Sequence, residues 1–189
     1  NPEISILLAV CLPLVGAIAI ILTGPRPNLR ESVTVITSLL TFGVVCTLVG
    51  PVMEGGHPEL ELMMVLPGLP LVFEVEPLGM LYAMVASGLW IPTGLYAIGY
   101  CRAHHEENQT RFFTCFALAI FAALGIAFAG NVFTLFLFYE TLTLSTYPLV
   151  THYGDEEAKR AGRVYLGILL GTSTVFFLLA LLWTWHLTG

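Results

Sequence analysis

Charged residues are scarce in this sequence. Asp, Glu, Lys and Arg together make up 11% of its 189 residues, whereas hydrophobic residues make up 57%. The mean hydropathy is +0.85, and a soluble domain of this size could not keep so much apolar surface away from water. The composition therefore excludes a water-soluble globular protein and predicts a protein embedded in a lipid bilayer.

Basic residues are the rarer of the two charge types. The sequence has 7 Lys and Arg against 13 Asp and Glu, which gives a net charge of -6. Such a balance offers no basic surface to DNA or RNA. We therefore expect no nucleic-acid partner.

Cysteines and histidines at the spacing of a metal site are missing as well. The cysteines, which show no CxxC spacing, are Cys11, Cys46, Cys101 and Cys115. Their pattern is typical of small buried side chains and not of a disulfide framework or a metal site. Histidines are equally scattered and show no metal-ligand spacing, at His57, His104, His105 and His186. We expect no metal and no cofactor in this chain.

Long apolar runs are what the sequence does contain. A helix needs roughly 20 residues to cross the ~30 Å of hydrocarbon in a bilayer. Runs of about that length, without Lys or Arg, lie at about residues 4–23, 32–51, 78–100, 112–129, 131–150 and 164–187. We predict an all-α, polytopic membrane bundle of about six transmembrane helices, which forms a single domain over residues 1–189.

Two connections between these runs have recognisable features. The apolar stretch Leu62–Phe73 is too short to be another span and is broken by Pro67 and Pro70. We predict a surface hairpin or a re-entrant cover there. The pair Gly130–Asn131 leaves room only for a tight turn, so the fourth and fifth spans should be antiparallel neighbours. Small residues in the fourth span, such as Gly125, would let the partner helix come close.

The basic residues predict the orientation of the chain in the membrane. They occupy alternate loops and therefore share one side, at Arg26, Arg30, Arg102, Arg111, Lys159, Arg160 and Arg163. The loop at residues 52–77 has glutamates but no Lys or Arg. By the positive-inside rule, the basic loops face the cytoplasm and the N terminus faces outward. We expect a multi-pass protein of the cell (inner) membrane.

One acidic residue, Glu140, lies near the middle of the fifth predicted span. At about 1.5 Å per residue it is roughly 14 Å from either surface, too deep for its short side chain to reach the headgroups. A bare carboxylate there would be costly, so the group must be protonated, hydrated or paired with a cation. A cation that approaches and withdraws would make such a group release and rebind a proton. Glu140 is therefore the predicted proton relay, and the alternative is a neutral carboxyl that only hydrogen-bonds a neighbouring helix.

Polar side chains extend from Glu140 along the same helix face toward the cytoplasmic end, and others lie at a comparable depth in the sixth span. The candidates for a proton path are Thr143, Tyr147, His152, Thr172 and Ser173. A simpler interpretation exists for each of them. Hydroxyl groups in membrane helices commonly bond their own backbone, and His152 also fits a plain interfacial histidine.

The residues around Glu140 resemble a known family. Residues 131–150 read NVFTLFLFYETLTLSTYPLV, and residues 161–173 read AGRVYLGILLGTS. Together they look like the fifth and sixth helices of the antiporter-like subunits, which are shared by Mrp-type sodium/proton antiporters, the membrane arm of complex I and membrane-bound hydrogenases. Tyr139 and the sequence LSTYP resemble the D-type Mrp and the hydrogenase branches more than the respiratory NADH dehydrogenase branch. At residues 73–79, FEVEPLG resembles the entry to the family's third helix, with glutamate where aspartate is usual.

This resemblance implies both a role and a missing part. It implies that Glu140 is the family's essential glutamate, which pairs with a lysine of the seventh helix. The sequence stops before that helix, so we expect the N-terminal half of a longer antiporter-like subunit, either a split gene product or part of a longer chain. Its expected partners are other membrane subunits, including one that supplies the C-terminal half with its lysine.

Three functions fit these observations. The first is proton translocation in a multisubunit sodium/proton antiporter, with protons as the ions moved and sodium as a candidate second ion. The second is the proton-pumping membrane arm of a redox complex linked to hydrogenase, ferredoxin or NADH chemistry. Because the sequence has no cluster or haem ligands, the redox centre would then belong to partner subunits. The third is a structural subunit in which Glu140 is vestigial.

Overall fold

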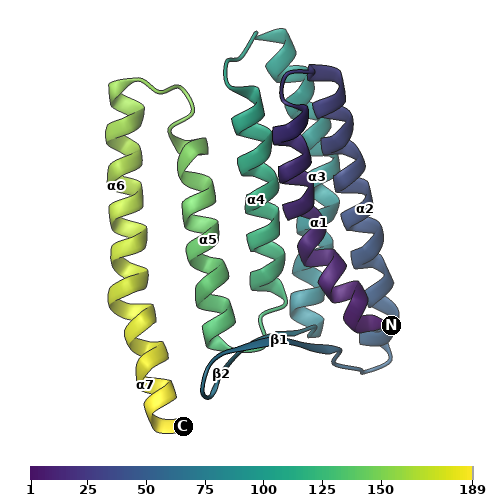
Figure 1. The fold of residues 1–189 in the computed structure, drawn as a ribbon, viewed down its shortest axis with the longest axis vertical. Coiled ribbons are helices and arrows are strands. Elements are labelled where there is room, and N and C mark those ends of the chain that lie inside the picture. Colours follow the sequence, from purple (N-terminus) through teal and green to yellow (C-terminus); the bar gives the residue numbers. More distant parts are fainter. Residues whose placement is uncertain (189) are drawn as a thin grey trace.

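The computed structural model describes residues 1–188 as a bundle of long helices with one β-hairpin (Figure 1). The helices are α1 (Pro2–Thr23), α2 (Pro27–Met53), α3 (Pro77–Ala103), α4 (Gln109–Ala127), α5 (Val132–Val150) and α6 (Glu156–Thr172). A short π-helix, η1 (Ser173–Phe177), joins α6 to α7 (Leu178–Thr188), and the three segments form one continuous rod (Figure 1). The prediction of an all-α membrane bundle is confirmed.

Most of these helices are apolar enough to be membrane spans. Within residues 1–188, 5 helical segments are long and apolar enough to cross a membrane by length and composition. Helix α5 has 19 residues, but Glu140 and several hydroxyl side chains make it less apolar, and it falls outside this set. The helix with the candidate relay residue is therefore long enough to cross but unusually polar.

Two helices begin more than one turn before the apolar runs that predicted them. Helix α2 begins at Pro27, a residue type that suits the first position of a helix. Helix α6 begins at Glu156, because Asp155 Oδ1 accepts a hydrogen bond of 2.6 Å from the backbone N–H of Ala158 and so caps the helix. Both helices thus include charged residues that precede the apolar runs.

The connections that carry basic residues meet at one end of the bundle, which we call the basic end (Figure 1). It is the end with Arg26, Arg30, Arg102, Arg111, Lys159, Arg160 and Arg163. The chain begins at the opposite end, and α7 also ends there (Figure 1). We call this opposite end the hairpin end, because it holds the β-hairpin.

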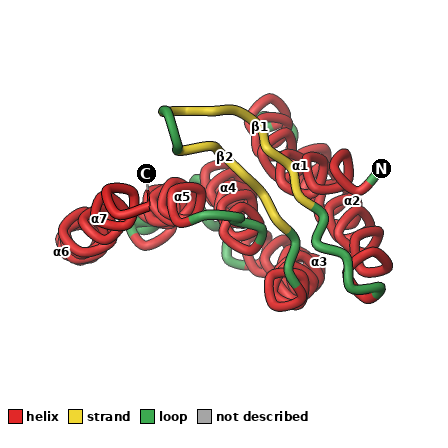
Figure 2. Tube along the Cα trace, turned by 90° about the horizontal axis from the view of Figure 1, so that it is seen from below, coloured by secondary structure: helices red, strands yellow, loops and turns green. Residues whose placement is uncertain are grey.

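The hairpin consists of β1 (Glu59–Leu66) and β2 (Leu69–Glu74), which pair antiparallel. The expectation of a hairpin at Leu62–Phe73 is thus correct. It lies across the ends of α1 and α4 (Figure 2), and the turn between α4 and α5 is tied to β2. Glu74 N–H donates to the Phe128 carbonyl at 2.8 Å, and Gly130 N–H donates to the Val72 carbonyl at 3.0 Å.

The first turn of α5 is held by the hairpin. Asn131 caps the helix through a 2.7 Å hydrogen bond from Thr134 N–H to its Oδ1, and its Nδ2 donates to the Pro70 carbonyl at 2.7 Å. The Thr134 hydroxyl oxygen is fully buried and accepts from Val72 N–H at 3.0 Å. These bonds fix where α5 begins and hence the depth of the residues that follow.

Helix α5 packs closely on α4, as the tight turn predicted. A Cβ atom at Gly125 of α4 would overlap the ring of Phe138 on α5, so only glycine permits this approach. Figure 2 shows α5 between α4 on one side and the rod of α6 and α7 on the other. The candidate relay helix thus lies at the border of the four-helix group α1–α4.

Candidate functional site

Glu140 lies near the centre of α5, eight residues after Val132 and ten before Val150. That is roughly 12 to 15 Å of helix to either end. Its Oε1 is fully buried and has no hydrogen-bond partner among residues 1–188. The site is therefore a deep carboxyl oxygen that the described part of the chain leaves unsatisfied.

Aromatic rings pack on both flanks of α5 around this position. Toward α4, Phe138 lies 5.3 Å from Phe121, measured between ring centroids. Toward the rod of α6, η1 and α7, the ring centroid of Phe177 in η1 lies 5.4 Å from that of Phe136 and 6.0 Å from that of Tyr139. Aromatic rings therefore pack on both sides of α5 next to Glu140 in the sequence.

Thr143 and Tyr147 follow Glu140 on its helix face, but the hydroxyl of Thr143 bonds its own helix. Thr143 is buried, and its Oγ1 donates to the Tyr139 carbonyl at 3.1 Å. Thr151 Oγ1 in turn donates to the Tyr147 carbonyl at 3.1 Å. The Thr143 hydroxyl therefore bonds its own backbone, as the simpler interpretation predicted. Because it acts as the donor, its oxygen can still accept a hydrogen bond from water.

Thr172 and Ser173 lie where α6 passes into η1. Thr172 is exposed and donates to the Ile168 carbonyl at 2.8 Å, whereas Ser173 is buried and donates to the Leu169 carbonyl at 2.9 Å. Single π-helical turns occur often at functional sites. The sequence gives no signal for this one, because no proline or glycine lies within Ser173–Phe177.

His152 lies just past α5 at the basic end, and its side chain is largely buried. Its Nε2 is 3.9 Å from Glu106 Oε2 in the α3–α4 connection, with 16% and 18% of the two side chains exposed. Its Nδ1 is buried without a hydrogen-bond partner within residues 1–188. Arg111 Nη2 donates to the His152 carbonyl at 2.8 Å and fixes the backbone. Sequence analysis missed Glu106, which is far from His152 along the chain.

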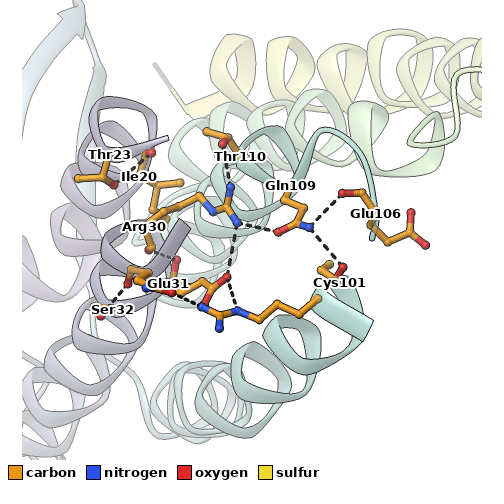
Figure 3. Close-up of polar contacts among 12 residues, drawn as sticks. Ile20, Thr23, Arg30, Glu31, Ser32, Cys101, Glu106, Gln109 and Thr110 are labelled. Atoms are coloured by element: carbon orange, nitrogen blue, oxygen red, sulfur yellow. Dashed lines mark hydrogen bonds and ion pairs between the residues drawn. The ribbon is translucent and has the colours of Figure 1, made fainter. Parts of the chain in front are cut away.

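A cluster of charged residues ties α2, α3 and α4 together at the basic end (Figure 3). Arg30 Nη2 donates to Gln109 Oε1 at 2.7 Å and lies 3.6 Å from Glu31 Oε1. Arg102 approaches both carboxylate oxygens of Glu31, with its Nε 3.1 Å from Oε1. Arg30 and Glu31 are both buried. These residues act as an anchor between helices.

Glu106 lies beside this cluster but does not belong to its charge pairs. Gln109 Nε2 donates to the Glu106 carbonyl at 3.0 Å and to the Cys101 carbonyl at 3.2 Å. The carboxylate of Glu106 points away from Arg30 and Glu31 (Figure 3). The anchor therefore positions the backbone of Glu106 and leaves its carboxylate free to face His152.

One group of metal-ligand types comes together at the hairpin end. The ligand atoms of His57, Glu74 and Glu76 all lie within 4.8 Å of one another. The spacing of the residues did not indicate this group, since the hairpin brings the segments together. His57 and Glu76 are exposed and Glu74 is half-buried, and such groups are common at protein surfaces without an ion.

Comparison with known proteins confirms the resemblance seen in the sequence. The family described as NADH:quinone oxidoreductase/Mrp antiporter, TM, matches residues 129–189, which include Glu140 and η1. An antiporter subunit of Staphylococcus haemolyticus, mnhA2, is 22% identical over 168 residues, which cover 82% of this chain and 21% of that protein. The Na(+)/H(+) antiporter subunit A1 of Staphylococcus aureus is 28% identical over 127 residues, 66% of this chain and 15% of the relative.

A solved structure has the same fold. A chain of the membrane-bound sulfane sulfur reductase, an archaeal respiratory membrane complex, superimposes with a TM-score of 0.79 at 23% identity. It covers 92% of this chain, which in turn covers 35% of that chain. The present sequence thus spans about a fifth or less of the curated relatives named above. The chain is thus a multi-pass membrane protein that is similar to antiporter-like subunits, and the NADH:quinone oxidoreductase/Mrp antiporter family matches its residues 129–189.

Proposed function

We propose that the chain forms part of the proton path of a multisubunit sodium/proton antiporter, with Glu140 as the relay carboxylate. The observation that carries the proposal is the buried Oε1 of Glu140, which has no hydrogen-bond partner among residues 1–188. Leaving such an acceptor unsatisfied costs about 1 to 3 kcal/mol, and more if the group is charged. Something outside the described chain must therefore donate to it.

A cation or water from another source fits that requirement. All Lys and Arg residues of this chain lie toward the basic end, and none shares the depth of Glu140. A lysine from the rest of a longer subunit, or from a neighbouring subunit, would stabilise the carboxylate when close and favour its proton when withdrawn. That alternation is the elementary step of a proton relay.

The orientation belongs to the same proposal. With the basic end in the cytoplasm, as the positive-inside rule requires, the hairpin end faces outward in the cell (inner) membrane. The polar face that runs from Glu140 through Thr143 and Tyr147 would then lead to the cytoplasmic end of α5. Water bound beside these hydroxyls, together with the buried Ser173 at the start of η1, would complete the path.

The length of the relatives supports the proposal that further chain or subunits are needed. The chain spans 21% and 15% of the two antiporter subunits named above. We infer that the present residues are the N-terminal part of a longer antiporter-like subunit, and that other membrane subunits assemble with it. The finer likeness to the D-type Mrp branch stays a prediction, because both named relatives are of the A type.

A second candidate is the proton-pumping membrane arm of a redox complex. The matching family includes NADH:quinone oxidoreductase as well as Mrp antiporters, and the solved structure belongs to a respiratory membrane complex. In this alternative Glu140 keeps its role, but electron transfer in partner subunits supplies the energy. Identification of the subunits that co-purify with this chain separates the two, since iron–sulfur subunits would support the redox complex.

The test of the shared step is replacement of Glu140 in the assembled complex. Glu140→Gln keeps the shape of the side chain and removes the titratable proton, so the complex should assemble and lose coupled proton transport. Transport at the parent rate would leave only a structural role for Glu140.

A further inference from the structure

We propose that Glu106 and His152 form a second proton-binding site, which collects protons from water at the basic end. This inference rests on the proposed function, because the collected protons are those that Glu140 would relay. It adds a residue, Glu106, and a location at the mouth of the path that the family resemblance did not suggest.

The first argument is the burial of the pair. With 16% and 18% of their side chains exposed, His152 and Glu106 are unlike an ordinary surface ion pair. Their facing atoms, Nε2 and Oε2, are 3.9 Å apart, so opposite charges on the two groups would attract each other at short range. The pair therefore places a carboxylate beside a histidine, the type of side chain whose charge changes most readily near neutral pH.

The second argument is the unsatisfied nitrogen of the same ring. His152 Nδ1 is buried and has no hydrogen-bond partner among residues 1–188. A buried polar atom without a partner costs free energy unless water or another group reaches it. When the ring is protonated, both nitrogens become donors, so Nδ1 then needs an acceptor. A water molecule beside the ring meets this need and gives the proton a route.

One cavity supplies room for such water, and a second, apolar one adjoins the same residues. One, of 260 Å³, is lined by the α3–α4 connection together with His152 and Tyr153. The other, of 320 Å³, reaches along α3 to Thr93 and is mostly apolar. Glu106, His152 and Tyr153 line both cavities. The pair thus lines both a polar cavity at the basic end and an apolar groove along the exposed residues Tyr96 and Tyr100 of α3.

Glu106 is the main charged partner of His152 among the titratable and charged groups around it. Arg111 comes from α4, and its Nη2 is bonded to the His152 carbonyl at 2.8 Å. The remaining titratable residues that line the two cavities are Tyr96, Tyr100, Cys101, His104, His105, Glu107 and Tyr153. Among described ion pairs, the only acidic partner of His152 is Glu106. A proton on His152 is therefore balanced by this carboxylate.

The structure also defines what the pair does not do. His152 lies 12 residues after Glu140, roughly 18 Å along a helix axis, which is too far for direct transfer. Water near the Tyr147 and Thr143 hydroxyls would have to bridge that distance. The pair thus binds protons at the start of the path, while Glu140 remains the relay carboxylate within the membrane.

Proton binding can be measured without transport. In the assembled complex with ¹⁵N-labelled histidine, the imidazole signals report protonation, and the signal of His152 is assigned by its loss in His152→Gln. At the pH where the parent His152 is half protonated, Glu106→Gln should lower its protonated fraction several-fold, and Glu106→Asp should lower it less. His186→Gln is the control, since His186 is exposed at the hairpin end and lines neither cavity, and it should leave the His152 signal unchanged.

Transport by the same variants completes the test. At equal amounts of assembled complex, His152→Gln and Glu106→Gln should slow proton uptake from the basic end several-fold, most strongly at alkaline pH where protons are scarce. Glu140→Gln should abolish transport at every pH. If both basic-end variants match the parent rate across the pH range, or if Glu106→Gln leaves the protonation of His152 unchanged, this inference is wrong. If Glu140→Gln alone transports normally, the relay itself fails.

Discussion

The ring of Phe138 on α5 occupies the space that a side chain at Gly125 of α4 would need. The same ring also packs against Phe73 of the hairpin, with ring centroids 5.4 Å apart. Gly125 therefore sets how closely the relay helix approaches the four-helix group. Because packed helices tolerate little added volume, this glycine should be sensitive to any substitution.

We predict that Gly125→Ala weakens the contact between α4 and α5. The added methyl group forces the Phe138 ring or the helix to move, at a cost of about 1 to 3 kcal/mol. The thermal unfolding temperature of the purified complex should fall. Gly43→Ala in α2 is the control, since a Cβ atom there has no described neighbour within 4 Å. An equal unfolding temperature for Gly125→Ala and the parent would contradict the packing described here.

The anchor at the basic end gives a second stability prediction. Glu31→Gln removes the carboxylate between Arg30 and Arg102 and leaves the buried Arg30 without a negative partner. Breaking a buried ion pair costs roughly 3 to 5 kcal/mol, and because Arg102 is half exposed we expect about 2 to 3 kcal/mol. Unfolding of the purified complex measures the loss.

Lys159→Gln is the matched control for that prediction. Lys159 forms an exposed pair with Glu156, at 2.9 Å and one turn apart on α6. Exposed pairs of this kind contribute about 0 to 1 kcal/mol, so the variant should unfold like the parent. A Glu31→Gln variant as stable as the Lys159→Gln variant would show that the anchor is dispensable.

The orientation is tested by chemical labelling. In a background without the native cysteines, His57→Cys lies in the connection at the hairpin end and Glu157→Cys in the first turn of α6 at the basic end. A thiol reagent that cannot cross the membrane should label the first from outside and the second only after the cytoplasmic side is opened. Labelling of Glu157→Cys from outside would reverse the orientation and the direction of the proposed path.

Sequence reasoning predicted the architecture well because the bilayer imposes simple requirements. Long apolar runs predicted the helices, and the prolines of Leu62–Phe73 correctly indicated that this stretch is not a span. The pair Gly130–Asn131 predicted the close contact of α4 with α5. Such features depend on residues that are neighbours along the chain, or on one helical period, and can be seen in a single sequence.

Contacts between segments that are distant along the chain could not be predicted from the sequence. Glu106 and His152 belong to different connections, and nothing in the local sequence indicates that the fold brings them within 3.9 Å. Likewise, Glu31 and Arg102 become partners only when α2 packs on α3. The depth of Glu140 was predictable from helical geometry, whereas its unsatisfied Oε1 required the packing of neighbouring side chains to be known.

The hydroxyl groups near the path should matter less than Glu140. Thr143 and Thr172 bond carbonyl groups of their own helices, and water can replace a hydroxyl in a hydrated path. Thr143→Val and Thr172→Val should each raise the barrier by no more than about 1 kcal/mol, roughly fivefold in rate. A loss of transport in Thr143→Val as complete as that expected for Glu140→Gln would make the hydroxyl itself an essential carrier.

Proton transport by Glu140 variants tests the central claim most directly. Vesicles that hold equal amounts of the assembled complex are loaded with a pH-sensitive dye, and transport is started by a sodium gradient or by the redox substrate. We predict severe loss in Glu140→Gln, because the proton-binding group is gone. Glu140→Asp should keep partial activity, because its carboxyl is withdrawn by only about 1.5 Å and water can bridge the gap. Proton movement at the parent rate in an assembled Glu140→Gln complex would contradict the account.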